Sequence, residues 1–222
     1  MSYGLRLALI DSDEFVREGR VLLLQSQPET QIVFQTSDAT TALVSVLDYL
    51  LDVIIVDSRI PGWNTDKYIA ELAARLTDVG NDAQILVTAS FGSPDFELSC
   101  LRAGASAFAT TEQGGAALLR QVRSIASGER AVPRKHLDDL LSKASTGAPA
   151  PHPGLAVSLE QMDQSQLAVV RAMLEGFTDG QISKNLELTK YRVSKFIESL
   201  RASNGFRTRV QLAIELLGFG AF

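Results

Sequence analysis

The sequence predicts an α/β fold with a doubly wound, five-stranded parallel sheet, followed by a small all-α domain. Three observations lead to this prediction. Short apolar runs alternate with segments of helical apolar spacing up to about residue 127. An uncharged stretch with three prolines follows, over residues 146–154. Beyond it, every periodic segment has the apolar spacing of a helix.

The N-terminal part alternates between strand-like and helix-like segments from its first residues. The predicted strands are Leu5–Ile10, Gln31–Gln35, Val53–Val56, Ile85–Thr88 and Ala107–Ala109. The predicted helices are Phe15–Gln25, Ala39–Leu50, Thr65–Leu76, Asp95–Ala103 and Gly114–Ser127. Such alternation with short connections is typical of a parallel sheet with helices on both faces. Right-handed crossovers then bring together the carboxyl ends of the first, third and fourth strands.

The proline-rich stretch divides the chain. Each proline removes a backbone donor and favours extended geometry in the residue before it, which makes the stretch a semi-rigid linker. A long loop within one domain is the less favoured alternative, because the patterns on the two sides differ. We therefore expect three parts: an α/β domain over residues 1–130, a helical extension and linker over 131–154, and a helical domain over 155–222.

Capping signals mark the helices of the last part. Asp163 with Gln166, and Thr178 with Gln181, each have the spacing of a capping box. Thr189 is expected to cap a third helix after a short turn at Glu187 and Leu188. A fourth helix is predicted from about Thr208 to Leu217. We expect this last helix to expose an apolar stripe that ends at Leu216 and Leu217 and suits a two-fold dimer.

Composition excludes several classes of protein. The chain has 222 residues, 45% of them apolar, and a net charge of −5. One cysteine and two histidines exclude a disulfide framework and a Cys/His zinc cluster. No apolar run approaches the roughly 18 residues that span a bilayer, so we expect a cytoplasmic protein with no membrane partner. Residues 171–209 carry 8 Lys and Arg against 4 Asp and Glu, which suits a polyanionic partner.

Polar side chains end three strands that the topology brings together. Asp57 follows a buried run and precedes Pro61-Gly62, Asp11 ends the first strand, and Thr88 ends the fourth. Converging carboxylates can hold Mg²⁺, and a nearby hydroxyl can bond a phosphoryl group. Each residue alone is more simply explained by hydrogen bonds to turn backbone. Three strand ends together favour a functional site.

Residues 5–130 resemble a response-regulator receiver domain, which has a flavodoxin-like fold. The matching residues are Ile10-Asp11, Asp57, Ile60-Pro61-Gly62, Thr88-Ala89 and Gly104-Ala105 before Phe108. The resemblance implies that Asp57 accepts a phosphoryl group from a histidine kinase, with Mg²⁺ held by Asp11 and Asp57. It also implies that Thr88 is the switch hydroxyl and that the rotamer of Phe108 follows it.

Two positions depart from the receiver pattern. Ser12 stands where the family has a second acid, and Thr111 stands where it has a lysine. A hydroxyl is a poorer Mg²⁺ ligand than a carboxylate, and Thr111 lacks the ammonium that pairs with phosphoryl oxygens. Phosphoryl transfer depends almost wholly on such charge stabilisation. We therefore expect an atypical receiver that controls dimerisation or DNA binding with weak or no dependence on Asp57 phosphorylation.

Alternatives to this interpretation remain open. One is a conventional regulator that a histidine kinase phosphorylates on Asp57, and another is a receiver that a protein or ligand controls without phosphate. Asp11-Ser12-Asp13 also resembles the first motif of haloacid-dehalogenase-type phosphatases. The late acid pair Asp138-Asp139 follows helix-like residues rather than a strand. We therefore expect no enzyme.

The third predicted helix of the C-terminal part has an apolar and a polar face. Val193, Phe196, Ile197 and Leu200 fall at helical spacing and predict the buried side. The polar, basic face opposite them fits a helix-turn-helix that docks in the major groove. An ordinary helical bundle with a solvated face is the alternative, as is a partner-binding protein that no longer reads DNA.

The helical part resembles the LuxR-type DNA-binding domain over about residues 159–217. The resemblance rests on residues 175–183, Leu186, Leu188, Val193 and residues 205–209, and the whole chain is similar to regulators of the NarL/FixJ type. Ser194, Phe196 and Gln166 differ from the residues common in that family. Such a regulator binds promoter half-sites in double-stranded DNA as a homodimer.

The third helix and its flanks supply the expected DNA contacts. We expect Tyr191, Ser194 and Lys195 to meet base edges. We expect the remaining basic residues to contact phosphates, which position the protein without reading sequence: Lys184, Lys190, Arg192 and Arg201. Glu198, on the same face, would repel phosphate but could accept from a cytosine amino group.

Overall fold

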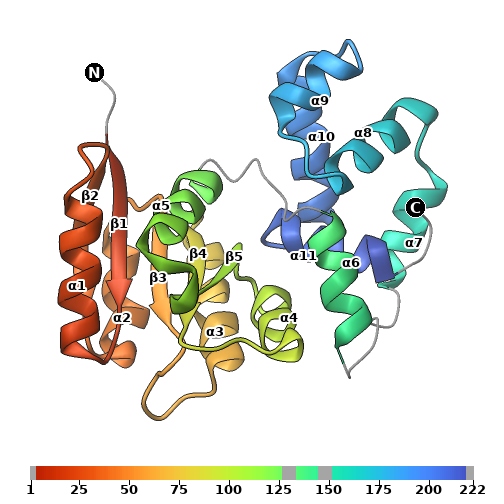
Figure 1. Ribbon diagram of the computed structural model, residues 1–222. Coiled ribbons are helices and arrows are strands. Elements are labelled where there is room, and N and C mark those ends of the chain that lie inside the picture. Colours follow the sequence, from red (N-terminus) through yellow and green to blue (C-terminus); the bar gives the residue numbers. More distant parts are fainter. Residues whose placement is uncertain (1–3, 127–133, 145–151, 219–222) are drawn as a thin grey trace. The chain divides into compact units, whose positions relative to one another are not determined.

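A computed structural model describes residues 4–126, 134–144 and 152–218 of the chain. Its N-terminal part is the predicted five-stranded parallel sheet, in the strand order β2-β1-β3-β4-β5 (Figure 1). The strands are β1 Leu5–Ile10, β2 Thr30–Thr36, β3 Val53–Asp57, β4 Gln84–Ala89 and β5 Ala107–Thr110. The helices are α1 Glu14–Gln25, α2 Ala39–Ser45, α3 Thr65–Asp78, α4 Pro94–Arg102 and α5 Gly114–Ile125. The predicted doubly wound α/β fold is confirmed.

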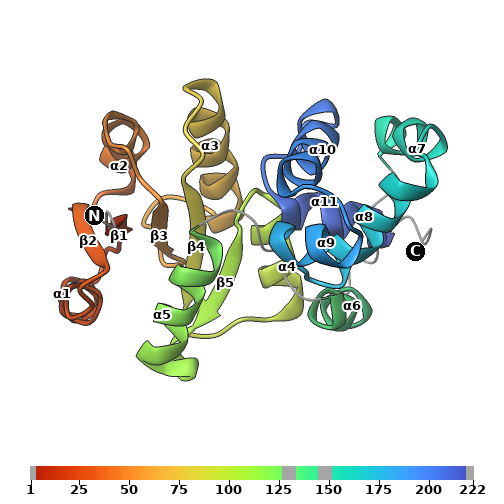
Figure 2. The ribbon, with the colours of Figure 1, turned by 90° about the horizontal axis from the view of Figure 1, so that it is seen from above.

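Helices cover both faces of this sheet. The view from above shows α1 and α5 on one face and α2 and α3 on the other (Figure 2). Side chains from alternate positions of four strands pack with α1 and α5 in one apolar core, for example Leu9, Ile55 and Leu86. Every residue of β3 is buried, which explains its nearly continuous apolar run.

The strand register aligns the carboxyl ends of the central strands. Ile10 pairs with Val56, Asp57 with Thr88, and Thr88 with Ala109. Asp11, which directly follows β1, therefore lies at the same edge of the sheet as Asp57 and Thr88. This is the convergence that the sequence predicts.

One helix of this part is shorter than predicted. The helix expected over Ala39–Leu50 is α-helical only to Ser45 and continues as a 3₁₀ turn over Val46–Asp48. Tyr49 is extended, and the Arg6 side chain binds the Leu50 carbonyl at 2.6 Å. The chain leaves the helix early because these residues lead directly into β3. Residue 127, the predicted end of the last helix, lies outside the described residues.

The rest of the described chain is helical. Its helices are α6 Arg134–Lys143, α7 Pro153–Glu160, α8 Gln164–Leu174, α9 Asp179–Asn185, α10 Lys190–Ser203 and α11 Arg209–Gly218. Both predicted capping boxes form, at Asp163 and at Thr178, and the Thr189 hydroxyl caps α10. No helix in the ranges described above is long and apolar enough to cross a membrane.

The predicted end of the linker, at residue 154, is wrong. Pro153 and Gly154 form the first turn of α7 rather than extended linker, and residues 146–151 lie outside the described ranges. Proline is favoured at the first turn of a helix, because its fixed φ suits the helix and its missing N–H has no partner there. All three prolines were expected to lie in extended linker, and for Pro153 this expectation is wrong.

A second correction concerns the last helix. The apolar stripe that the sequence led us to expect on the surface is buried in α11, including Leu212, Ile214 and Leu216. Only Leu217 is half-exposed. Six of the ten residues of α11 are buried, so its apolar side chains form part of the core and supply no dimer surface.

The chain divides into two compact units. The first comprises the residues up to Ser93 with those from Ser99 to the end of α5, and the second joins Pro94–Leu98 to the helices α6–α11. Within the second unit, His136 of α6 lies 2.7 Å from Glu97, and this hydrogen bond raises the pKa of the imidazole.

Candidate regulatory site and nucleic-acid interface

The two predicted acids meet at the carboxyl edge of the sheet. Asp11 and Asp57 are each only 1% exposed. Burial raises the pKa of Asp11, an effect to which the neighbouring charge of Asp57 adds. Two buried carboxylates side by side are unfavourable unless a cation compensates them.

The side chain of Arg20 supplies that cation. Its Nη1 donates to Asp11 Oδ2 at 2.5 Å, and its Nη2 lies 3.0 Å from Asp57 Oδ2. The Arg20 side chain is 8% exposed, so this is a buried ion-pair network. Arg20 therefore joins the two acids through one guanidinium.

Sequence reasoning missed Arg20. It lies on α1, nine residues after Asp11, among the apolar positions that face the sheet: Val16 precedes it and Leu24 follows it by one helical turn each. A charged residue within an apolar stripe is the signal that could have found it. A buried arginine needs a carboxylate partner, and Asp11 and Asp57 were the acids already placed at that face.

A second arginine holds the other side of Asp57. The backbone N–H of Arg59 donates to Asp57 Oδ1 at 3.0 Å, and its Nε donates to the same oxygen at 3.1 Å. This hydrogen bond raises the pKa of Arg59. Asp57 thus faces one guanidinium at each carboxylate oxygen.

The neighbours of Asp11 have structural roles. The Ser12 hydroxyl donates to the Arg59 carbonyl at 2.9 Å. Asp13 caps α1 by accepting from Val16 N at 3.1 Å. The acid pair Asp138 and Asp139 lies on helix α6 rather than at a strand end, and pairs with Arg134 and Lys143.

The predicted switch residues lie beside the acids. Thr88 is buried, and its hydroxyl donates to the Val56 carbonyl at 3.4 Å. Phe108 is 7% exposed on β5, and the β4–α4 loop passes close to its ring at Gly92. Thr111, at the position of the missing lysine, is exposed just after β5. A switch through Thr88 and Phe108 stays a prediction.

Helices α9 and α10 form a helix-turn-helix. The turn of residues 186–189 includes Glu187 at a φ of 55°, and the Ser183 hydroxyl donates to the Leu188 carbonyl at 2.7 Å. A left-handed backbone at a non-glycine residue is unfavourable by about 1–2 kcal/mol, so the surrounding contacts must hold this turn.

Helix α10 presents the predicted polar face to solvent. Val193, Ile197 and Leu200 are buried, whereas Phe196 is half-buried rather than fully packed. The exposed side chains are Lys190, Tyr191, Arg192, Ser194, Lys195 and Glu198, and Lys184 is exposed at the end of α9. Tyr191 is 74% exposed, an unusual position for a large aromatic side chain and one that suits a contact surface.

Lys195 and Arg201 illustrate contacts of this face with the rest of the protein. Lys195 Nζ lies 3.4 Å from Glu198 Oε2, one turn along the helix. Arg201 is half-buried, and its Nη1 donates to the Phe206 carbonyl at 3.4 Å. Arg201 therefore stabilises the end of α10, and the other basic residues form the more accessible part of the surface.

A buried ion pair that sequence reasoning also missed supports the helix-turn-helix. Arg209, at the start of α11, binds Asp179, at the start of α9, and both are almost fully buried. Asp179 follows the Thr178 cap, and acidic residues are common in the first turn of a helix, so its sequence position does not distinguish it. Nothing in the sequence pattern links it to a residue thirty positions later.

No family model matches the chain. It is 26% identical over 209 residues to the DNA-binding transcriptional activator DevR/DosR of Mycobacterium tuberculosis, covering 94% of this chain and 92% of that protein. A two-component response regulator of the LuxR family from Aurantimonas is 25% identical, with a TM-score of 0.53 over 64% of this chain and 96% of that one. The response regulator RcsB of Salmonella typhimurium shares the fold along 98% of both chains, at 17% identity and a TM-score of 0.55.

These relatives and the fold agree with the resemblance drawn from the sequence. The relatives are regulators rather than enzymes, and they match the chain over nearly its whole length. The chain is thus similar over nearly its whole length to response regulators of the NarL/FixJ type, in which a receiver precedes a LuxR-type helix-turn-helix.

Proposed function

We propose that this protein is a DNA-binding transcription regulator whose receiver works with little or no dependence on phosphorylation of Asp57. The first part rests on relatives that are DNA-binding transcriptional regulators and on the exposed basic face of α10. The second part rests on one observation, the guanidinium of Arg20 between Asp11 and Asp57.

Arg20 stands where a receiver needs a divalent cation. Mg²⁺ takes about six oxygen ligands at roughly 2.1 Å in octahedral geometry. Here one oxygen of each acid faces Arg20, and the other accepts from Asp13 N or from Arg59. Ser12 offers a hydroxyl that already donates to a backbone carbonyl. The described residues contain no cluster of three or more acids, histidines or cysteines that could hold a metal ion. The donor set does not fit Mg²⁺.

The same contact disfavours phosphoryl transfer. A carboxylate that accepts a phosphoryl group needs a free oxygen and a cation for the incoming charge. Asp57 Oδ2 lies against Arg20, and Thr111 brings no ammonium. Phosphorylation would also have to break a buried ion pair, which costs several kcal/mol.

For the DNA-binding surface, we retain the predicted roles of α10. Tyr191, Ser194 and Lys195 contact base edges, while Lys184, Lys190 and Arg192 contact phosphates. The protein binds two half-sites as a homodimer, as expected for a helix-turn-helix that reads symmetric DNA. The dimer surface is not the apolar stripe of α11, because that stripe is buried.

A phosphodonor experiment tests this proposal. The full chain is treated with acetyl phosphate and Mg²⁺, and its intact mass and its affinity for a duplex selected from a random DNA library are measured. We expect no stable mass increase and the same DNA affinity with and without the phosphodonor. The variant Asp57→Asn should bind the duplex as tightly as the wild type.

The conventional alternative gives the opposite result. A mass increase of one phosphoryl group, absent in Asp57→Asn and accompanied by tighter DNA binding, would establish control by phosphorylation. Failure to select any duplex would contradict the DNA-binding part. The two parts of the proposal are therefore tested separately.

A further inference from the structure

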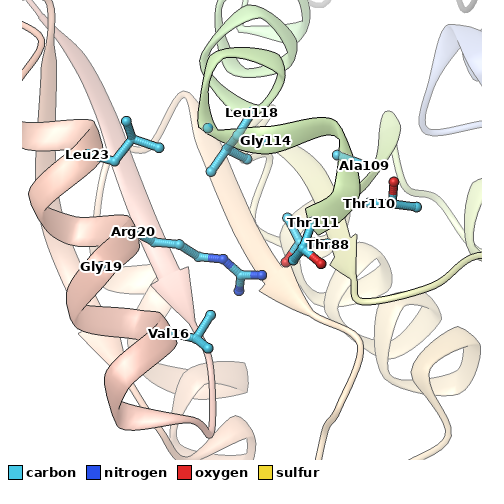
Figure 3. Close-up of a pocket in the computed structure, with 11 residues that line it drawn as sticks. Val16, Gly19, Arg20, Leu23, Thr88, Ala109, Thr110, Thr111, Gly114 and Leu118 are labelled. Atoms are coloured by element: carbon cyan, nitrogen blue, oxygen red, sulfur yellow. The ribbon is translucent and has the colours of Figure 1, made fainter.

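A cavity of about 240 Å³ lies between α1 and the β5–α5 connection, within the first unit. Its wall is apolar, formed by Val16 and Leu23 of α1 and Leu118 of α5. At one end are three polar side chains, Arg20, Thr88 and Thr111. Figure 3 shows the Arg20 side chain reaching from α1 toward the two threonines at the ends of the strands. An apolar cavity with a few convergent polar groups is the usual form of a small-molecule site.

Three glycines line this cavity: Gly19, Gly114 and Gly115. A Cβ on Gly19 would meet no atom within 4 Å, so its missing side chain leaves space rather than avoids a clash, whereas the φ of 74° at Gly114 itself favours glycine. A Cβ on Gly115 would lie 2.7 Å from Leu23 Cδ2, so a side chain there would push into the cavity wall. Glycine within a helix is destabilising relative to alanine. Gly19 is in the middle of α1, and nothing in its local packing requires a glycine there.

The polar end of the cavity has a hydrogen-bond donor that a ligand acceptor could bind. Arg20 is more than nine-tenths buried, and its Nη2 makes no well-aligned hydrogen bond, although it lies 3.0 Å from Asp57 Oδ2. Thr88 and Thr111 add hydroxyls that can donate or accept. A buried N–H without an aligned acceptor is unfavourable, and a ligand oxygen would satisfy it.

The charges at this end are already balanced. The guanidinium of Arg20 is shared between Asp11 and Asp57, and Arg59 also pairs with Asp57. An anionic ligand would compete with two buried carboxylates, and a cationic ligand would face the guanidinium. An uncharged ligand avoids both penalties.

We propose that this cavity binds a small, uncharged organic molecule with an apolar body and one carbonyl or hydroxyl oxygen that accepts from Arg20. The volume is below that of a drug-sized site, so the molecule is about the size of a single substituted ring. Because Arg20 touches both the cavity and Asp57, such a ligand alters the acid cluster directly. This inference rests on the proposed function and deepens it, since it names what acts on a receiver that phosphorylation does not control.

Acetophenone, a ring with one carbonyl, is the probe, and NMR of the full chain labelled with ¹⁵N-glycine is the measurement. The 16 glycines give a sparse spectrum, in which Gly19, Gly114 and Gly115 report on the cavity. We expect saturable shifts of these three signals. Toluene, which lacks the carbonyl, should bind at least several-fold more weakly, and benzoate and benzylamine should produce no saturable shift.

Variants connect the binding to the cavity. Gly19→Leu fills the space while favouring the helix, and it should abolish binding. Gly180→Leu, at an exposed glycine of α9 that also has no atom within 4 Å of its Cβ, is the matched control and should bind as the wild type does. Thr111→Val, which replaces the hydroxyl with a methyl group of similar size, should weaken the binding of acetophenone more than that of toluene.

The proposal is overturned if acetophenone gives no saturable shift, if the shifts persist in Gly19→Leu, or if benzoate or benzylamine binds as tightly as acetophenone. This measurement uses neither DNA nor a phosphodonor. Its failure therefore leaves the proposed function standing, and phosphorylation-dependent DNA binding would refute that function without altering the NMR result.

Discussion

At the scale of single residues, the proposed function depends on Arg20. Asp57 has the position of a phosphoryl acceptor, but its surroundings are those of a buried ion-pair network. Such networks are often no more stabilising than apolar packing, whereas removing one member is strongly destabilising because a buried charge is left alone. In the proposed function, the identity of one helical residue therefore limits what the two carboxylates can do.

The variant Arg20→Met tests this role. It removes the guanidinium and keeps a long side chain, so two buried carboxylates are left facing each other. In EDTA we expect the free energy of unfolding to fall by about 3–5 kcal/mol. Millimolar Mg²⁺ should recover part of this loss, because the acids then lack any other cation. Urea unfolding followed by the fluorescence of Trp63, the chain's single tryptophan, measures both effects.

Two controls accompany this measurement. The wild type should be insensitive to Mg²⁺, and Arg120→Met, at an exposed position of α5, should unfold as the wild type does. Equal stabilisation of the wild type and Arg20→Met by Mg²⁺ would contradict the idea that Arg20 replaces the metal ion.

At the scale of elements, α10 separates structural from recognition residues. Its buried side consists of Val193, Ile197 and Leu200, and its N-terminus is fixed by the Thr189 cap. The ion pair between Asp179 and Arg209 holds α9 against the start of α11. The exposed face is thus presented by a helix whose position does not depend on the residues proposed to contact DNA.

Lys195 and Arg192 are expected to behave differently when replaced by alanine. Loss of a base contact should cost about 1–3 kcal/mol and relax sequence preference, which we expect for Lys195→Ala. Loss of a phosphate contact should weaken binding to all sequences about equally, which we expect for Arg192→Ala. Binding to the selected duplex and to single-base variants of it, measured by fluorescence anisotropy, distinguishes the two. Lys143→Ala, on α6, is the control, and identical profiles for Lys195→Ala and Arg192→Ala would refute the assignment.

At the scale of the whole molecule, overall charge and local charge have opposite signs. The chain carries a net charge of −5, so its total charge repels DNA. The basic excess is confined to residues 171–209. Binding must therefore depend on a local surface and be sensitive to salt.

A salt series checks this expectation. Each phosphate contact releases counterions, and the logarithm of the binding constant should fall with the logarithm of salt concentration by about 0.9 per contact. Arg192→Ala should reduce this slope by about 1. A binding constant that does not change with salt would contradict a surface built from Lys184, Lys190 and Arg192.

The fold could be predicted from sequence because its signals are local. The apolar run of β3, the two capping boxes and the Thr189 cap each depend on residues within a few positions of one another. Local spacing therefore predicted all five strands and the sheet class, and the resemblance to LuxR-type domains favoured the helix-turn-helix over an ordinary helical bundle. The errors occurred where local signals were ambiguous. Proline is common both in linkers and in the first turn of a helix, as at Pro153. An apolar stripe has the same sequence pattern whether it is exposed or buried, as along α11.

By itself the sequence determined the class of fold, the convergence of Asp11, Asp57 and Thr88, and the polar face of α10. Only the tertiary structure decided what surrounds those acids. Arg20 and Arg209 each meet carboxylates from other elements, and such pairings depend on how helices pack rather than on spacing along the chain. Burial makes the loss of either partner strongly destabilising, because a charge removed from water needs a partner of opposite charge. Asp57 therefore identifies the fold, and the arginine packed against it is the group on which the proposed function depends.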